Sequence, residues 1–172
     1  MSPAVGAYDL YFTGSRGNPR QCIIIGEDVE PIFYRFETPD VYMTNTTTTI
    51  YRNSDVVAAF DWTASSYLGL CTVRHRQPFP MSQLVLQGSS ATARAFYLNQ
   101  VKFEWRRDKD DPTGYSLYTA QNIRIASFRR QDQNTPVGPS HAFLQYTFVQ
   151  PALLLESLLA LCVNRWIDGN HV

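Results

Sequence analysis

The sequence predicts a mainly β domain, a closed antiparallel barrel of about twelve strands around a buried hydrophobic C-terminal helix. Short β-rich runs alternate with turn residues over most of the chain, as in a meander of strands with one wet face. One leucine-rich stretch near the C-terminus lacks this alternation and is apolar on all sides. No linker or shift in composition divides the 172 residues, so we expect a single domain over residues 1–172.

The stretch Pro151–Ile167 is the predicted central helix. Pro151 suits a first helical position, where its missing N–H is not needed, and Gly169 with Asn170 signals the end. Large apolar residues cover nearly the whole circumference, so we expect the helix to be buried all round. They are Leu153, Leu154, Leu155, Leu158, Leu159, Leu161, Val163, Trp166 and Ile167.

A membrane-spanning role for this helix is disfavoured by its length. Its uninterrupted apolar part, Ala152–Val163, contains Glu156. A spanning helix needs roughly 20 apolar residues, whereas runs of about 10–14 are typical of buried core helices. We therefore predict no transmembrane segment.

Short strands are predicted along residues 8–149, separated by turns rich in Gly, Pro, Asn and Asp. Thr46–Arg52 and Val56–Trp62 form a hairpin pattern around Asn53–Asp55. The other strands are Tyr8–Phe12, Gln21–Ile25, Ile32–Glu37, Val41–Met43, Tyr67–His75, Met81–Leu86 as an edge strand, Ala95–Leu98, Val101–Arg107, Tyr115–Thr119, Ile123–Arg129 and His141–Val149.

The clearest strand is Val101–Arg107, where apolar and charged residues alternate strictly, so that one face is dry and the other wet. Polar loops are predicted at Asp108–Gly114 and Gln131–Pro139. The apolar positions of the strand are Val101, Phe103 and Trp105, and the charged ones are Lys102, Glu104 and Arg106.

Closure follows from the number of strands. So many strands with one wet face must curl or close to bury the other face. A barrel of that size has a lumen too wide for its own side chains to fill. A helix that is apolar on all sides fills such a lumen, so we place Pro151–Ile167 inside.

The order and spacing of several motifs resemble the tubby C-terminal-like fold, which tubby proteins, LURP-one-related proteins and phospholipid scramblases share. More closely, the sequence resembles an uncharacterised domain family of mushroom-forming fungi. The resemblance spans Tyr8–Asp168. It rests on Thr48–Arg52, Val56–Trp62, Val101–Arg107, Tyr115–Tyr118, Ile125–Arg130 and the leucine-rich helix.

This resemblance implies contact with lipids. Tubby domains bind phosphoinositide headgroups through basic residues on the barrel surface, and scramblases act at membranes. No headgroup motif matches this sequence position by position, so no binding residue is carried over. The fungal family itself has no established activity.

The charge balance argues against nucleic acid as a partner. Fifteen basic and fifteen acidic residues cancel, so no net field attracts a polyanion. All the basic residues except Lys102 and Lys109 are arginines, whose planar guanidinium suits local pairing with carboxylates.

Two basic clusters are the candidate sites for an anion or a lipid headgroup, which they would hold through charge-assisted hydrogen bonds. The alternative is that neighbouring acids such as Glu104, Asp108, Asp110 and Asp111 neutralise the first cluster locally. The first cluster is Lys102, Arg106, Arg107 and Lys109, and the second is Arg74 and Arg76.

Catalytic, metal and cofactor motifs are absent from the sequence, and we predict no cofactor. There is no GxSxG, P-loop or HExxH pattern. The cysteines Cys22, Cys71 and Cys162 lack zinc spacing, and the Asp108–Asp111 cluster lacks the calcium-loop pattern. The histidines His75, His141 and His171 are scattered.

We therefore expect a non-enzymatic binding module whose ligand is a phospholipid headgroup or another protein. The N-terminus lacks the features of a secretory signal, so we expect a cytoplasmic protein, peripheral to a membrane if its ligand is a lipid. The alternative is a lipocalin-type carrier of a small apolar ligand, with an open lumen and the helix packed outside. A third hypothesis is a hydrolase that uses His75 or His141.

Overall fold

The computed structural model describes residues 7–14, 18–26, 32–39, 46–63, 68–135 and 138–169. These residues form thirteen strands in one antiparallel sheet, one short 3-10 helix and one α-helix. The mainly β class and the single C-terminal helix predicted from the sequence are confirmed. Among the described residues, no helix has the length and hydrophobicity to cross a membrane. The predicted strand Val41–Met43 lies outside the described residues.

Most strands coincide with the predicted β-rich runs to within a few residues at each end. The elements are β1 (Tyr8–Thr13), β2 (Cys22–Gly26), β3 (Ile32–Glu37), β4 (Thr47–Arg52), β5 (Asp55–Asp61), β6 (Leu70–Val73), β7 (Phe79–Pro80), the 3-10 helix η1 (Met81–Leu84), β8 (Leu86–Gln87), β9 (Ala93–Leu98), β10 (Val101–Arg107), β11 (Tyr115–Thr119), β12 (Arg124–Thr135), β13 (Gly138–Tyr146) and α1 (Pro151–Gly169).

The sheet is a meander whose first and last strands are neighbours. β1 pairs with β2 on one side and with β13 on the other. From this central pair the sheet extends through β2–β7 in one direction and through β13–β8 in the other. The two edges, β7 and β8, are therefore consecutive in the chain, and η1 connects them. No strand pairing joins β7 to β8 in the described part of the chain, so the sheet is not closed by hydrogen bonds. The predicted closure of the barrel is therefore not confirmed.

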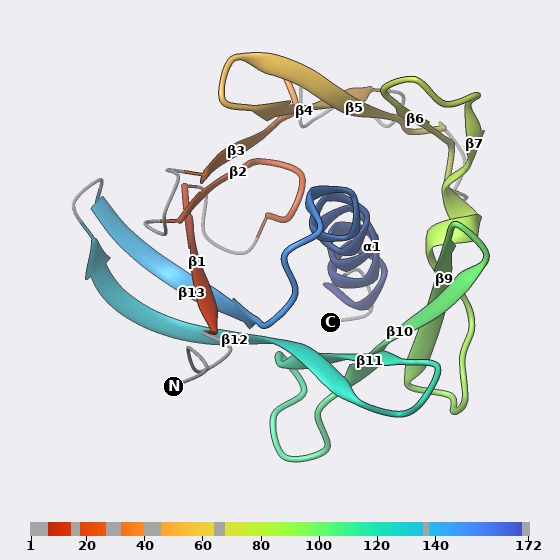
Figure 1. The fold of residues 1–172 in the computed structure, drawn as a ribbon. Coiled ribbons are helices and arrows are strands. Elements are labelled where there is room, and N and C mark those ends of the chain that lie inside the picture. The colour runs from red at the N-terminus through yellow and green to blue at the C-terminus, as the bar shows by residue number, and fades with distance from the viewer. Residues whose placement is uncertain are drawn as a thin grey trace.

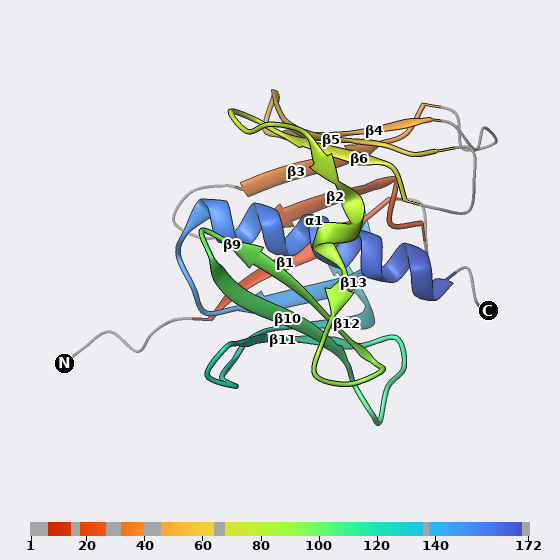
Figure 2. The same ribbon diagram turned by 90° about the vertical axis from the view of Figure 1, so that its right-hand side faces the viewer.

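The helix α1 lies inside the curl of the sheet, with strands arranged around it (Figures 1 and 2). Leu159, Ala160 and Val163 are completely buried, and the Trp105 indole N–H of β10 donates to the Ser157 carbonyl of α1 at 3.0 Å. A helix inside the sheet is the predicted arrangement. It differs from the one that the lipocalin-type carrier required, an open lumen with the helix outside.

The buried helix also carries polar residues, which pair with arginines of the sheet and its loops. Glu156 is 2 % exposed and accepts a hydrogen bond from Arg76 at 2.8 Å. Burial raises the pKa of Glu156, and Arg76 opposes this effect. Asn164 accepts from Arg94 at 3.0 Å. Glu156 and Asn164 therefore have partners that offset the cost of removing them from water, whereas the buried hydroxyl of Ser157 has none.

Two predicted elements are wrong. Met81–Leu86 is a 3-10 turn followed by a two-residue strand, because Met81 and Leu84 are three residues apart and are both buried, a spacing that brings them to one side of a 3-10 helix. Gln131–Pro139 contains strand residues where a loop was predicted. There β12 continues to Thr135 and β13 begins at Gly138, since backbone pairing extends the hairpin although most of the side chains are exposed.

Replacement of Leu158 by aspartate tests the buried position of α1. Leu158 is 2 % exposed, so Leu158→Asp places an unpaired charge in the core. We expect a loss of about 4 kcal/mol or more in the free energy of unfolding, enough to prevent folding. Circular dichroism and thermal melting measure it, with Leu70→Asp at a half-exposed position as the control. A Leu158→Asp variant that melts cooperatively at the wild-type temperature would show that α1 is not a core helix.

Candidate anion-binding site

The sheet separates the basic residues that are adjacent in the sequence. Arg106 lies on the outer face of β10, where its Nε donates to Glu104 at 2.6 Å and its guanidinium stacks on Tyr118. By strand alternation Lys102 shares that face. Arg107 points to the opposite face and lies 3.8 Å from Asp168 of α1. The predicted cluster Lys102, Arg106, Arg107 and Lys109 is therefore not one patch.

The other predicted candidates have different surroundings. Arg76 is paired with Glu156 and lies over the ring of Phe79, so its charge is compensated. Arg74 and Lys109 are exposed. Pairing with a neighbouring acid, the alternative given for the first cluster, is observed for Arg106 with Glu104. The partner of Arg76, in the second cluster, is distant in the sequence.

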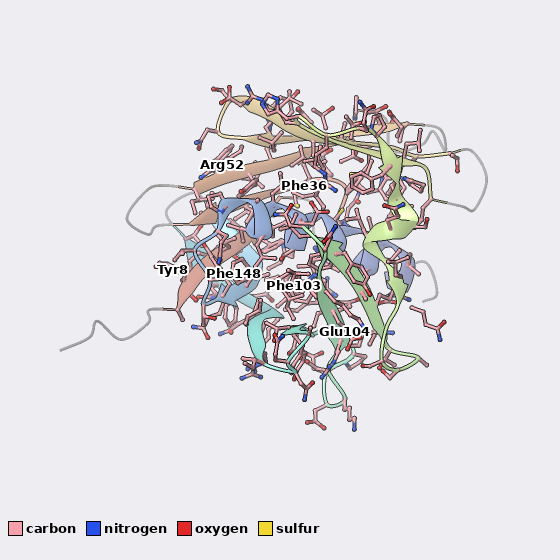
Figure 3. The ribbon with its side chains drawn as sticks, turned by 45° about the vertical axis from the view of Figure 1, so that its right-hand side comes forward. Tyr8, Phe36, Arg52, Phe103, Glu104 and Phe148 are labelled. Carbon is pink, nitrogen blue, oxygen red and sulfur yellow. The ribbon has the colours of Figure 1, made fainter. Side chains whose placement is uncertain are left out.

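Glu104 is buried although the sequence places it on a wet face. It is 4 % exposed because the loop after β8 covers it, with the Ser89 backbone N–H and hydroxyl donating to its two oxygens at 2.7 and 2.6 Å. Burial alone would raise the pKa of Glu104, but the hydrogen bonds from Ser89 and Arg106 outweigh it and lower the pKa. Val101 is the opposite case, since the alternation predicts a buried position and the residue is half-exposed at the end of its hairpin. Figure 3 labels Glu104 and the adjacent residue Phe103, both on β10.

Three arginines from separate elements meet at the C-terminal end of α1. They are Arg107 at the end of β10, Arg130 on β12 and Arg165 on α1, and they line a pocket of about 170 Å³. We call it the arginine pocket. Its lining is completed by Pro112, Thr113, Tyr115, Phe128, Asp168 and Gly169.

Asp168 is the one carboxylate among the residues that line this pocket, and its oxygens are already engaged. It accepts hydrogen bonds from Arg94 at 3.0 Å and from the Tyr115 hydroxyl at 2.6 Å. Burial alone would raise its pKa, but these hydrogen bonds and the charges of Arg94 and Arg107 lower it. Asp168 is therefore shared between Arg94 and Arg107, and it is the one carboxylate against the three arginines that line the pocket.

Arg165 has no acidic partner in the described part of the chain. Its guanidinium lies 4.7 Å from the centre of the Phe128 ring and 5.9 Å from that of Phe12. Burial lowers the pKa of Arg165, yet an arginine stays charged in proteins. The aromatic faces offset part of the cost of this charge, and an anion in the pocket would offset the rest.

A further arginine near this end of α1 has a structural explanation. Arg20 is 5 % exposed, and its guanidinium lies against both Trp62 and Trp166, at 4.7 and 4.6 Å from the centres of the two rings, which are themselves in contact. Its Nε and one terminal nitrogen have no hydrogen-bond partner. Cation–π contacts with the two indole rings stabilise it. Because it does not line the arginine pocket, we assign it no binding role.

A model for a family of unknown function, DUF6593, matches residues 17–163. The chain belongs to this family. No curated protein and no solved structure matches it. The DUF6593 match includes Arg107 and Arg130 and ends inside α1, just before Arg165 and Asp168.

The remaining chemistry-bearing residues of this DUF6593 protein are dispersed. His75 is exposed in the turn after β6, His141 is buried in β13, and His171 lies outside the described residues. The cysteines are free and buried. Within the described ranges, no cluster of His, Cys, Asp or Glu is arranged to hold a metal ion.

The carboxylate of Asp168 makes the free energy of unfolding depend measurably on pH. Because the pKa of Asp168 is lower in the folded than in the unfolded chain, its stabilising contribution is complete above the unfolded value of about 3.9 and is lost as the pH falls through the folded value. We expect Asp168→Asn to lower the free energy of unfolding at pH 7 by about 1.5–3 kcal/mol, the range for hydrogen bonds to a charged group.

Urea titrations of wild type and Asp168→Asn from pH 7 down to pH 2 measure this effect, with Asp55→Asn at an exposed position as the matched control. The difference between wild type and Asp168→Asn should shrink below pH 4. A difference that stays constant over this range would show that the ionised form of Asp168 contributes nothing.

Proposed function

We propose that this protein is a non-enzymatic binding module whose ligand presents a phosphate-type anion to the arginine pocket. The observation that carries the proposal is the guanidinium of Arg165, packed on Phe128 without an acidic partner in the described chain, beside Arg107 and Arg130. Guanidinium groups donate paired hydrogen bonds that match phosphate oxygens.

The charges around the pocket leave a clear excess. Arg94, Arg107, Arg130 and Arg165 are opposed by Asp168 in the pocket lining and by Asp111, whose carboxylate interacts with Arg130. The C-terminal end of α1 adds about half of another negative charge. The whole chain is balanced, so this excess is local. Its sign selects anions, and its position among aromatic residues strengthens the interaction relative to open solvent.

The size of the pocket favours a headgroup over a whole lipid. Its volume of about 170 Å³ is below the roughly 300 Å³ at which pockets for drug-sized ligands begin. A phosphate group suits this space, with the rest of the ligand outside. We therefore propose a phospholipid headgroup as the source of the anion, which would hold the protein at the cytoplasmic surface of a membrane.

Assignment to the tubby C-terminal-like fold is part of the same proposal. It is supported by the position of α1 inside the curled sheet and by the antiparallel pairing of the first and last strands. Of the six candidate residues expected from the sequence, Arg107 lines the pocket. A fungal origin stays a prediction from the sequence motifs.

Substitution of Arg130 tests this function without disturbing the fold, because Arg130 is exposed. Arg130→Gln is compared with Arg124→Gln, the same change at an exposed position of the same strand. The probes are soluble inositol trisphosphate, measured by calorimetry, and phosphatidylcholine vesicles with and without phosphatidylinositol bisphosphate, measured by flotation. We expect Arg130→Gln to weaken binding about tenfold, as loss of one charge-assisted contact predicts, and Arg124→Gln to bind as wild type.

A Lys102→Gln/Arg106→Gln variant provides a second comparison, since it changes the outer face of β10 alone. It should bind both probes like wild type. Failure of wild type to bind either probe, or equal losses for Arg130→Gln and Arg124→Gln, would exclude the arginine pocket as the site. If wild type binds inositol trisphosphate but does not float with the vesicles, the pocket is an anion-binding site and its ligand is not a membrane phospholipid.

A further inference from the structure

A second pocket lies at the opposite end of α1, where the helix begins. Its volume is about 300 Å³, at the lower end of the range for small-molecule sites. Figure 3 shows Tyr8, Arg52 and Phe148 on this side of the molecule, away from Glu104. The lining residues come from β1, β3, β4, β13, the segment between β13 and α1, and the first turn of α1. Those used below are Tyr8, Tyr34, Arg52, Tyr146, Phe148, Val149 and Leu154.

The walls of this pocket are mainly apolar and aromatic. The rings of Tyr8 and Tyr146 lie 5.3 Å apart between their centres, and those of Tyr146 and Phe148 lie 5.2 Å apart. Leu154 of α1 contributes an aliphatic surface. Such walls bind the apolar part of a ligand by removing both surfaces from water.

Arg52 is the one charged residue that lines this pocket. Its Nε is buried and has no hydrogen-bond partner, and Arg52 forms no ion pair with the described residues. An unsatisfied buried donor costs about 1–3 kcal/mol, and native structures contain few of them. The neighbouring Tyr34, opposite Arg52 in the sheet register, stays neutral because burial raises its pKa, with Arg52 acting in the opposite direction.

We propose that this pocket binds a small amphipathic carboxylate. The carboxylate pairs with the guanidinium of Arg52, and the apolar body packs against Tyr8, Tyr146 and Phe148. A single arginine supplies one positive charge and a planar fork that a carboxylate matches in charge and geometry. The volume restricts the apolar body to a short chain or a single ring.

This site is independent of the proposed anion function. The two pockets share no lining residue and lie at opposite ends of α1. They also differ in kind, because three arginines surround a phosphate-sized space in one and aromatic rings surround one arginine in the other. A result that contradicts one proposal therefore does not contradict the other.

Calorimetric titration with octanoate, octanol and octylammonium tests the inference, since these probes share a chain and differ in head-group charge. We expect wild type to prefer octanoate to octanol by about tenfold, which corresponds to one charge-assisted hydrogen-bonded pair, and to bind octylammonium most weakly. Arg52→Leu should lose this preference and bind octanoate and octanol alike. Arg124→Leu, at an exposed position, should behave as wild type.

Stability and a second variant separate a binding role from a structural one. Arg52→Leu removes an unpaired donor, so its melting temperature should be no lower than that of wild type. Val149→Trp, at a 71 % exposed position on the pocket rim, should obstruct the entrance and weaken all the probes without changing the charge.

Arg52→Leu should bind inositol trisphosphate as wild type does, and Arg130→Gln should bind octanoate as wild type does. The inference is overturned if wild type binds none of the three probes, if Arg52→Leu retains the preference for octanoate, or if Arg52→Leu unfolds and Val149→Trp still binds octanoate as wild type does.

Discussion

The structure depends on one constraint, the burial of the inner face of a very wide sheet. Thirteen antiparallel strands present a row of apolar side chains too broad for opposite walls to cover one another. The helix α1 satisfies this constraint because it is apolar on nearly every side, and because its polar groups find partners on the sheet. The carboxylate of Glu156 meets Arg76, and the carbonyl of Ser157 meets the indole of Trp105.

The filled interior leaves a pocket where the helix begins and another where it ends, and a third lies along β10 beside Lys102 and Arg106. Along the middle of α1, residues such as Leu159 and Val163 are completely buried, whereas a pocket opens at each end. Both pockets contain an arginine without an acidic partner in the described chain, Arg52 at the start of the helix and Arg165 near its end. The two proposed sites thus lie where the packing of α1 against the sheet ends.

Sequence patterns predicted the elements whose periodicity is set by burial, such as Val101–Arg107 and the leucine-rich helix. They failed where tertiary contacts decide the environment. A charged residue in an alternating strand is predicted to be exposed, and no neighbouring residue in the sequence indicates that Ser89 covers Glu104. The arginine pocket was missed for a similar reason, since Arg130 and Arg165 are separated in sequence and become neighbours only when β12 packs beside α1. Adjacent basic residues in the sequence predicted a single cluster, but Arg106 and Arg107 lie on opposite faces of their strand.

Amide hydrogen exchange along α1 tests most directly whether the helix fills the sheet. The account predicts that the amides of Leu159 and Val163 exchange only through global unfolding, with an opening free energy equal to that measured by urea denaturation. Exchange of these amides through a much smaller opening, while the strands stay protected, would contradict it. The helix would then leave the sheet without unfolding it, and the interior would be open to ligands.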